Sequence, residues 1–259
     1  MTTAQPAIGL LGGQVALVTG GAGGLGAAIC ETLAGAGASV VVGYLNSQGP
    51  AQTLATELPL MANQPPHSAL HAPVTDSAAL ASLAREIEAR YGRCDIVVNC
   101  AGTTRFVPHA ALDELDDALI DDILATNVRG PFAVVRAMRA LLERSDAALV
   151  VNLSSIAAVT AMGSNVVYCA SKAALDNMTR SLARALAPRI RVLAVSPGLA
   201  DTDFVKSMDA GWRDEQAVRT PLKRLAQPSE VGSAVLACAT HLTFTTGAVI
   251  PIDGGRPLA

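Results

Sequence analysis

The chain has 259 residues, of which 51% are hydrophobic and 16% charged, and its formal net charge is −3. This is enough apolar sequence for one α/β domain with a sizeable core, while the slight acidity and the lack of lysine or arginine runs argue against a nucleic-acid partner. The hydrophobic segments are shorter than the roughly 18 uninterrupted residues of a membrane span, so we expect no membrane segment.

The first residues have neither the basic start nor the apolar run of a secretory signal. We predict a flexible leader over 1–13, followed by a single domain over 14–259. The five cysteines are odd in number and scattered without a C-x-x-C spacing, and the four histidines show no ligand spacing. This pattern indicates neither a disulfide framework nor a metal site, and a reducing, cytoplasmic location fits it best.

Seven short segments rich in β-branched residues are predicted as strands, and longer segments with apolar residues at helical spacing separate them. Strands that are apolar on both faces and alternate with helices indicate a parallel, doubly wound sheet of the Rossmann type, with helices on both faces. Ligands of such sheets bind beyond the carboxyl ends of the strands. The predicted strands span 14–19, 38–44, 68–74, 94–99, 147–154, 189–196 and 247–253.

Glycines are concentrated between the first predicted strand and the first predicted helix. In TGGAGGLG, residues 19–26, five of the eight residues are glycine. Glycine lets the backbone turn tightly and approach a pyrophosphate, whose charge is stabilised by free N–H groups and by the helix dipole. An ordinary strand-to-helix turn is the alternative, but this position in the chain favours a dinucleotide site.

Small or hydrogen-bonding residues also follow the later strands. NCAG (99–102) follows the fourth strand, Ser154 and Ser155 follow the fifth, and SPGLADT (196–202) follows the sixth. Each of these segments could merely form a turn or cap the next helix. Their recurrence at one edge of the sheet favours a shared binding site.

Tyr168 and Lys172 stand four residues apart in YCASK, within a predicted helix. On a helix these side chains lie on one face, with Cβ atoms roughly 5–6 Å apart. A solvated surface pair is the simple alternative. A fixed ammonium beside a phenol would instead lower the phenol pKa from its usual value near 10 and favour the phenolate.

In this order, the motifs resemble the short-chain dehydrogenase/reductase family, from about residue 14 to residue 255. The resemblance implies an NAD(P)-dependent oxidoreductase that transfers a hydride between a nicotinamide and a carbonyl or secondary alcohol. The matching motifs are T-G-x-x-x-G-x-G at Thr19, N-x-A-G at Asn99, the lone Asn127, Ser155, Tyr168-x-x-x-Lys172, Pro197-Gly198 with Thr202, and the closing Asp253-Gly254-Gly255.

The resemblance also implies a role for each matching residue. Tyr168 would be the general acid/base, Lys172 would tune it and hold the nicotinamide ribose, Ser155 would bond the reacting oxygen, and Asn127 would anchor a proton-relaying water. Residues implied in cofactor binding are Thr19, Gly20, Gly24, Leu25, Gly26, Tyr44, Asn46, Ser47, Val74, Asn99, Ala101, Gly102, Tyr168, Lys172, Pro197, Gly198 and Thr202.

The end of the second strand bears on the choice of cofactor. An acidic residue there would bond both ribose hydroxyls and repel a 2′-phosphate, but Tyr44 occupies the place. Gly23 and Leu45 stand where relatives often carry arginine, while Asn46 and Ser47 could still bond a phosphate. We therefore favour NADP(H) over NAD(H).

The substrate is expected to be a medium-sized, partly apolar carbonyl or alcohol compound. Residues 202–219 resemble the mobile lid of the family, with Phe204, Met208 and Trp212 as an apolar ceiling. A surface helix packed on the core is the alternative.

Two other functions are weighed against this one. A 3-oxoacyl-carrier-protein reductase is the nearest, although its carrier would need a basic patch and the nearby Arg136, Arg139 and Arg144 are followed by Asp146. A non-catalytic nucleotide-sensing protein is the other, and such proteins usually lose the tyrosine or the lysine. Family habit also implies a homotetramer, with the last strand and the tail near subunit contacts.

Overall fold

The computed structural model describes residues 9–258 and contains one parallel, seven-stranded sheet in the order β3-β2-β1-β4-β5-β6-β7. All seven predicted strands are confirmed. Their bounds are β1 Val15–Thr19, β2 Ser39–Tyr44, β3 Ser68–His71, β4 Ile96–Asn99, β5 Leu149–Leu153, β6 Arg191–Pro197 and β7 Val249–Ile252.

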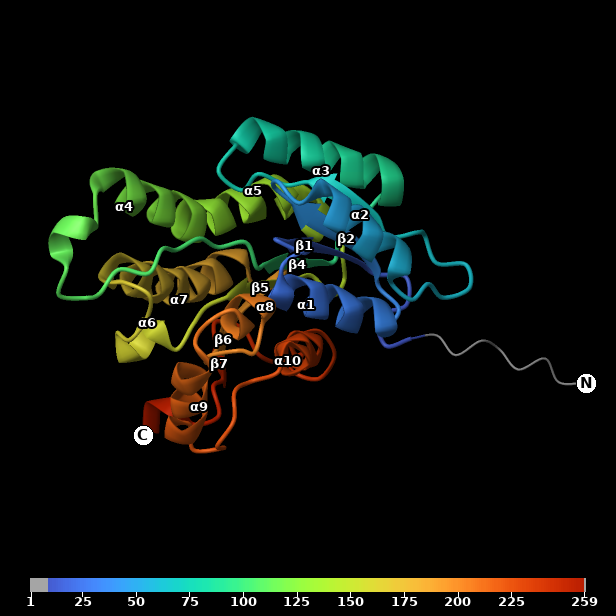
Figure 1. The fold of residues 1–259 in the computed structure, drawn as a ribbon. Helices are drawn as coiled ribbons and strands as arrows, with labels where there is room; N and C mark the ends of the chain where they lie inside the picture. The colour runs from blue at the N-terminus through green and yellow to red at the C-terminus, as the bar shows by residue number, and fades with distance from the viewer. Residues whose placement is uncertain (1–8, 259) are drawn as a thin grey trace, which may run out of the picture.

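Helices cover both faces of this sheet, as the alternating pattern predicts (Figure 1). The longer helices are α1 Gly24–Gly35, α2 Gln48–Glu57, α3 Ser77–Tyr91, α4 Asp117–Leu124, α5 Gly130–Leu142, α7 Val166–Leu186, α9 Ala210–Arg219 and α10 Pro228–Thr240. The short ones are η1 Leu112–Glu114, the π-helical turn η2 Ala125–Arg129, α6 Ala157–Thr160, α8 Asp203–Lys206 and η3 Arg256–Leu258.

Successive residues of each central strand point to opposite faces, and both faces are buried. In β1, Ala16 and Val18 pack into the core beneath α1 and α10, whereas Val15 and Leu17 pack into the core beneath α3 and α5. Because side chains alternate across a strand, a segment buried on both sides must be apolar throughout. This explains why the strands are readable as continuous apolar runs.

The strand order reverses beside β1, which pairs with β2 on one side and with β4 on the other. Thr19 at the end of β1 lies in register with Asn99 at the end of β4. In a doubly wound sheet the chain leaves these two neighbouring strands toward opposite faces, so a crevice opens between their carboxyl ends. The fold therefore places the glycine-rich segment and the NCAG segment on the two sides of one crevice.

A buried carboxylate ties the opposite, amino end of the central strands together. Asp95 is 0% exposed and accepts hydrogen bonds from the Val15 N–H at 2.8 Å, from the Ser145 hydroxyl and from Arg93 Nε at 2.9 Å. Each of these donors satisfies part of the hydrogen-bonding capacity of the carboxylate, and together they offset the free-energy cost of burying its charge. Asp95 is thus a structural residue on the side of the sheet away from the crevice.

The chain ends differ in part from the prediction. Residues 1–8 of the predicted leader lie outside the described residues, but Leu11 is only 1% exposed and its N–H donates to the Ala36 carbonyl at 2.8 Å. The described end of the leader therefore packs against the domain, because Leu11 finds an apolar site there. β3 ends at His71 rather than at residue 74, since Pro73 has no N–H for a ladder.

Within residues 9–258, no helix combines the length and the apolarity that crossing a bilayer requires. The five cysteines are all free thiols.

Candidate functional site

The glycine-rich segment forms a backbone cradle that only glycine fits. Gly20 has φ +65°, and a Cβ on Gly26 would lie 2.1 Å from the Gly20 carbonyl oxygen. No side chain caps α1 at Gly23, so the N–H groups of the first turn, at Gly24, Leu25 and Gly26, remain directed out of the helix end. Free N–H groups at a helix N-terminus, on a backbone without side chains, suit a pyrophosphate.

Thr19 and Asn99 lie beneath this cradle rather than on its surface. Thr19 is 1% exposed, and its hydroxyl accepts from the Cys100 N–H at 3.1 Å and the Ala101 N–H at 3.2 Å. Asn99 is 2% exposed and donates to Asn152 Oδ1 at 2.9 Å. Both residues therefore shape the floor of the crevice by holding the β4 loop in place.

The glycine-rich loop and the β4 loop are in direct contact. A Cβ on Gly20 would lie 3.0 Å from Ala101 Cα. A Cβ on Gly102 would lie 3.3 Å from Asn127 Oδ1 and 3.8 Å from Lys172 Nζ. The backbone at Gly102 thus runs from the nucleotide cradle to the side chains predicted to be catalytic.

The end of β2 presents polar side chains on the same edge. The Tyr44 ring lies 5.7 Å from the His71 ring, between centroids. Asn46 and Ser47 are exposed just before α2, and their side chains make no hydrogen bond to the described part of the chain. Val74, after β3, is 8% exposed and packs against Gly130, so it can offer little beyond its backbone.

The segment after β6 closes the crevice from the other side. Pro197 is buried at the end of β6, and the Gly198 N–H donates to the Ile252 carbonyl at 3.0 Å. Thr202 caps α8 by accepting from the Val205 N–H at 3.4 Å, and its Cβ lies 3.0 Å from the position of a Cβ on Gly24. Thr202 therefore stands against the first turn of α1, where the cradle N–H groups lie.

Ser155, Tyr168 and Lys172 come together at the carboxyl end of β5. Tyr168 is in the first turn of α7, Lys172 Nζ lies 5.7 Å from the centroid of its ring, and the Ser155 hydroxyl is near enough to lower the pKa of the phenol. Lys172 is 7% exposed and donates to the Leu153 carbonyl at 2.8 Å. The predicted one-face arrangement of the phenol and the ammonium is thus present, with a hydroxyl beside the phenol.

In the protein alone, the phenol pKa is shifted in the opposite direction to the lowering predicted for Tyr168 beside Lys172 and the positive ring of the cofactor. Burial raises the pKa of Tyr168 above its usual value, and the neighbouring Ser155 hydroxyl offsets this only in part. Burial also lowers the pKa of the Lys172 ammonium to about 8. The ammonium is directed to the Leu153 carbonyl and over the ring face, so desolvation of the phenol outweighs its attraction to the ammonium.

Asn127 holds the β4 loop from the π-helical turn between α4 and α5. Its Oδ1 accepts from the Thr103 N–H at 2.9 Å, and its Nδ2 donates to the Thr103 carbonyl at 2.9 Å and to Ser171 Oγ at 3.2 Å. π-helical turns are uncommon and are frequent at functional sites. The amide of Asn127 thus fixes the loop backbone to α7, and all of its polar atoms are engaged in doing so.

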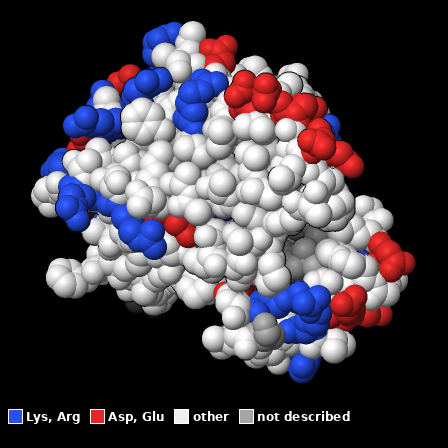
Figure 2. Space-filling view, turned by 90° about the vertical axis from the view of Figure 1, so that its left-hand side faces the viewer, with Lys and Arg blue, Asp and Glu red and all other residues white. Residues whose placement is uncertain are grey.

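The short helix α8 and the longer helix α9 form the predicted lid region. Arg213 pairs with Asp201 at 2.9 Å, and Arg256 donates to the carbonyl and the side-chain oxygen of Gln216 at 2.7 and 2.6 Å. Met208 is partly buried and Trp212 is 39% exposed, while the side chain of Phe204 lies outside the described residues. Figure 2 shows a face with charges around its rim and on its lower lobe, an uncharged middle, and a hollow between the middle and the lobe.

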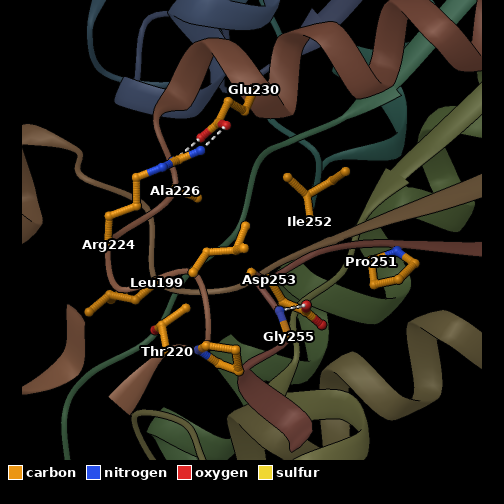
Figure 3. Close-up of a pocket in the computed structure, with 12 residues that line it drawn as sticks. Leu199, Thr220, Arg224, Ala226, Glu230, Pro251, Ile252, Asp253 and Gly255 are labelled. Carbon is orange, nitrogen blue, oxygen red and sulfur yellow. Dashed lines mark hydrogen bonds and ion pairs between the residues drawn. The ribbon is translucent and has the colours of Figure 1, made fainter. Parts of the chain in front are cut away.

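A cavity of about 480 Å³ lies at the carboxyl ends of β6 and β7 (Figure 3). Leu199 and Ile252 line it, and Arg224 and Glu230 meet at one end in two hydrogen bonds of 2.7 Å. A second cavity of about 240 Å³ lies between α6 and α7 and is lined mainly by alanines. Ser155, Tyr168 and Lys172 line neither cavity, so the candidate site is defined by the residues that gather at the carboxyl ends of the strands.

Sequence reasoning missed two polar residues of this site, Asn165 and Ser171, which are both 0% exposed. Asn165 is the N-cap of α7 and accepts from the Tyr168 N–H at 2.7 Å. An asparagine three residues before a helical tyrosine is a recognisable N-cap signal. Its contact with the β4 loop has no local signal, because the two segments are far apart in the sequence.

Comparisons with known proteins place the chain in a well-populated family. The family described as Enoyl-(Acyl carrier protein) reductase matches residues 20–256. A protein named as ketoacyl reductase 2 of the granaticin polyketide synthase of Streptomyces violaceoruber is 37% identical over 94% of this chain and 96% of its own. The cis-4-hydroxycyclohexanecarboxylate dehydrogenase of Sinomonas cyclohexanicum is 35% identical over 93% of this chain and 96% of its own.

A solved structure agrees with these relatives. A gluconate 5-dehydrogenase from Burkholderia cenocepacia, in complex with NADP and tartrate, superposes with a TM-score of 0.85 at 29% identity. The match covers 96% of this chain and 97% of that one.

Proposed function

The chain belongs to the short-chain dehydrogenase/reductase family of NAD(P)-dependent oxidoreductases. We propose that it reduces a carbonyl compound with Tyr168 as the general acid. One observation supports the proposal most: Tyr168, Ser155 and Lys172 lie close together at the same edge of the sheet as the glycine cradle. The reverse reaction, oxidation of a secondary alcohol, would use the same groups.

NAD(P) would be held by the cradle N–H groups at Gly24, Leu25 and Gly26, with Thr202 and the Gly102 backbone at its sides. When bound, this cofactor supplies or accepts the hydride. The fit rests on the space at Gly26, where any side chain would collide with the Gly20 carbonyl. Thr19 and Asn99 would contribute by holding the floor of the crevice, because their side chains are engaged beneath it.

The proton on the Tyr168 phenol would go to the carbonyl oxygen as the alcohol forms. Because burial raises the pKa of Tyr168, the phenol is protonated at neutral pH and ready to act as an acid. Ser155, which lies beside the phenol, would donate a hydrogen bond to the reacting oxygen and hold it there. Lys172 would hold the nicotinamide ribose and would stabilise the phenolate that remains, and Asn127 would hold the loop between them.

NADP(H) is the cofactor that we favour. No carboxylate stands at the end of β2, where Tyr44 is found, and the free side chains of Asn46 and Ser47 can donate to a 2′-phosphate. The related gluconate 5-dehydrogenase, which is complexed with NADP, supports the same choice.

The second candidate is a 3-oxoacyl-carrier-protein reductase, which the name of the Streptomyces relative supports. The basic residues that would dock an acidic carrier are already engaged. Arg139 pairs with Glu143 and Arg144 with Glu88, both at 2.7 Å, and Arg136 donates to Ser77 at 2.9 Å. This candidate therefore stays second to a small-molecule substrate.

A partly apolar substrate suits the uncharged face between α4 and the lid (Figure 2). We also propose a homotetramer. The half-exposed edge strand β7 and the fully exposed Phe244 would lie at its subunit contacts. Light scattering of the purified protein would test this, and a monomer would contradict it.

The test of the proposed function is a substrate panel assayed with both nucleotides. Ketones, 3-oxoacyl thioesters, sugars and steroids should be offered with NADPH and with NADH, and the consumption of reduced nucleotide followed. We expect reduction of a ketone-type substrate, faster with NADPH. Preference for a thioester on its carrier over the same thioester on a small pantetheine would favour the second candidate. No turnover with any substrate would contradict an enzymatic function.

A further inference from the structure

Asn165 occupies the junction between the loop that precedes α7 and the helix that carries Tyr168. It is 0% exposed, and its backbone is extended, with φ −168° and ψ 172°. The position is the N-cap of α7, three residues before Tyr168. A residue here controls how the first turn of the helix begins.

The side chain of Asn165 uses both ends of its amide. Its Oδ1 accepts from the Tyr168 N–H at 2.7 Å. Its Nδ2 donates to the Arg105 carbonyl at 2.8 Å and to Thr104 Oγ1 at 3.2 Å, both in the loop after β4. An aspartate could keep the cap but could not donate to the Arg105 carbonyl, and a serine could cap but is too short to reach the loop. Asparagine therefore links the first turn of α7 to the loop after β4, whereas aspartate or serine at this position would cap the helix without making that link.

The same loop is tied to α7 at a second point. Asn127 holds both backbone groups of Thr103 and donates to Ser171, one turn into the helix. The Thr104 hydroxyl also meets Ser164 Oγ at 2.5 Å. With these contacts, the loop after β4 holds the first turn of α7 on both sides of Tyr168.

We infer that Asn165 is a positioning residue that sets the position of Tyr168 relative to Ser155. Its amide does so by hydrogen-bonding the Tyr168 N–H on one side and the loop after β4 on the other. Ser155 follows β5, so the distance between the two hydroxyls depends on where the first turn of α7 stands relative to the sheet. A misplacement of about 1 Å in such a site can cost about 100-fold in rate. This inference rests on the proposed function, in which Tyr168 and Ser155 act on the same oxygen.

The test compares Asn165→Asp and Asn165→Ser with the unmodified protein and with Tyr168→Phe. We expect both Asn165 variants to fold, because each keeps a cap for the Tyr168 N–H. We expect kcat to fall roughly 10- to 100-fold in both. The Kd for NADPH should stay within about twofold, because Asn165 does not touch the glycine cradle. A purely structural role would instead lower the unfolding midpoint and leave kcat per folded molecule unchanged.

The outcomes distinguish the catalytic role of Tyr168 from the positioning role of Asn165. If Tyr168→Phe keeps its turnover, the proposed role of Tyr168 is wrong, whatever Asn165 does. If Tyr168→Phe is inactive but both Asn165 variants keep kcat within about twofold, only the positioning role is wrong. Failure of both Asn165 variants to fold also overturns it, because the residue would then be needed for folding itself.

Discussion

Replacing Gly26 by alanine tests whether the cradle must be bare backbone. The added Cβ would lie 2.1 Å from the Gly20 carbonyl oxygen and 2.9 Å from the carbonyl carbon and from Gly21 Cα. Real Cβ contacts stay at or above 3.0 Å, so the loop or the helix must move by about 0.9 Å. All three obstructing atoms belong to the backbone, so no flexible side chain can yield. Overpacking of this kind typically costs about 1–3 kcal/mol.

The movement would carry the N–H groups of the first turn of α1 away from their present directions. We expect Gly26→Ala to weaken NADPH binding roughly 5- to 150-fold, since each 1.4 kcal/mol is about tenfold. Fluorescence titration with NADPH measures this, and urea unfolding separates it from a loss of fold. Gly23→Ala is the matched control, because its Cβ would meet only the Gly20 oxygen, at 3.4 Å, and φ is −84°. Equal NADPH affinity in wild type and Gly26→Ala would show that the bare backbone at Gly26 is not needed for binding.

Three further predictions concern cofactor choice, pH and stability. Tyr44→Asp should shift kcat/KM toward NADH by about tenfold or more, since a carboxylate repels a 2′-phosphate; an unchanged ratio would contradict the NADP(H) choice. The kcat of reduction should fall above about pH 8 as Lys172 loses its proton, and a profile without that inflection would remove Lys172 from the rate. Asp95→Ala should lower the free energy of unfolding in urea by about 2–5 kcal/mol, because the Val15 N–H and the Ser145 hydroxyl lose their acceptor. Glu86→Ala, which removes the exposed Arg90–Glu86 ion pair, is the control for Asp95→Ala and should lower the free energy of unfolding by less than about 1 kcal/mol. Similar losses of stability in the two variants would contradict the structural role of Asp95.

The sheet could be predicted from the sequence because its strands are buried on both faces. Val40, Val41 and Val42 are each 0% exposed, and a segment of this kind is apolar throughout. The strand ends were harder to place where a turn or a proline intervenes, as at Pro73 after β3. The described end of the leader was also missed, because one apolar residue, Leu11, gives no periodic signal.

The candidate site could be predicted as a set of residues but not as an arrangement. The spacing of Tyr168 and Lys172 gives their common face, since that depends on helix geometry alone. The direction of the Tyr168 pKa depends on burial, which comes from packing that no local pattern reports. The hydrogen bonds from the Asn165 amide likewise depend on the approach of Thr104 and Arg105, about 60 residues away in the chain.

In the function that we propose, the phenol of Tyr168 transfers the proton beside a bound nicotinamide. Tyr168→Phe removes one oxygen and leaves the cradle, Lys172 and the helix cap in place. We expect this variant to bind NADPH with unchanged affinity and to lose turnover by about 100-fold or more, the range of a lost general acid. Turnover at the wild-type rate in a variant that binds NADPH normally would contradict it.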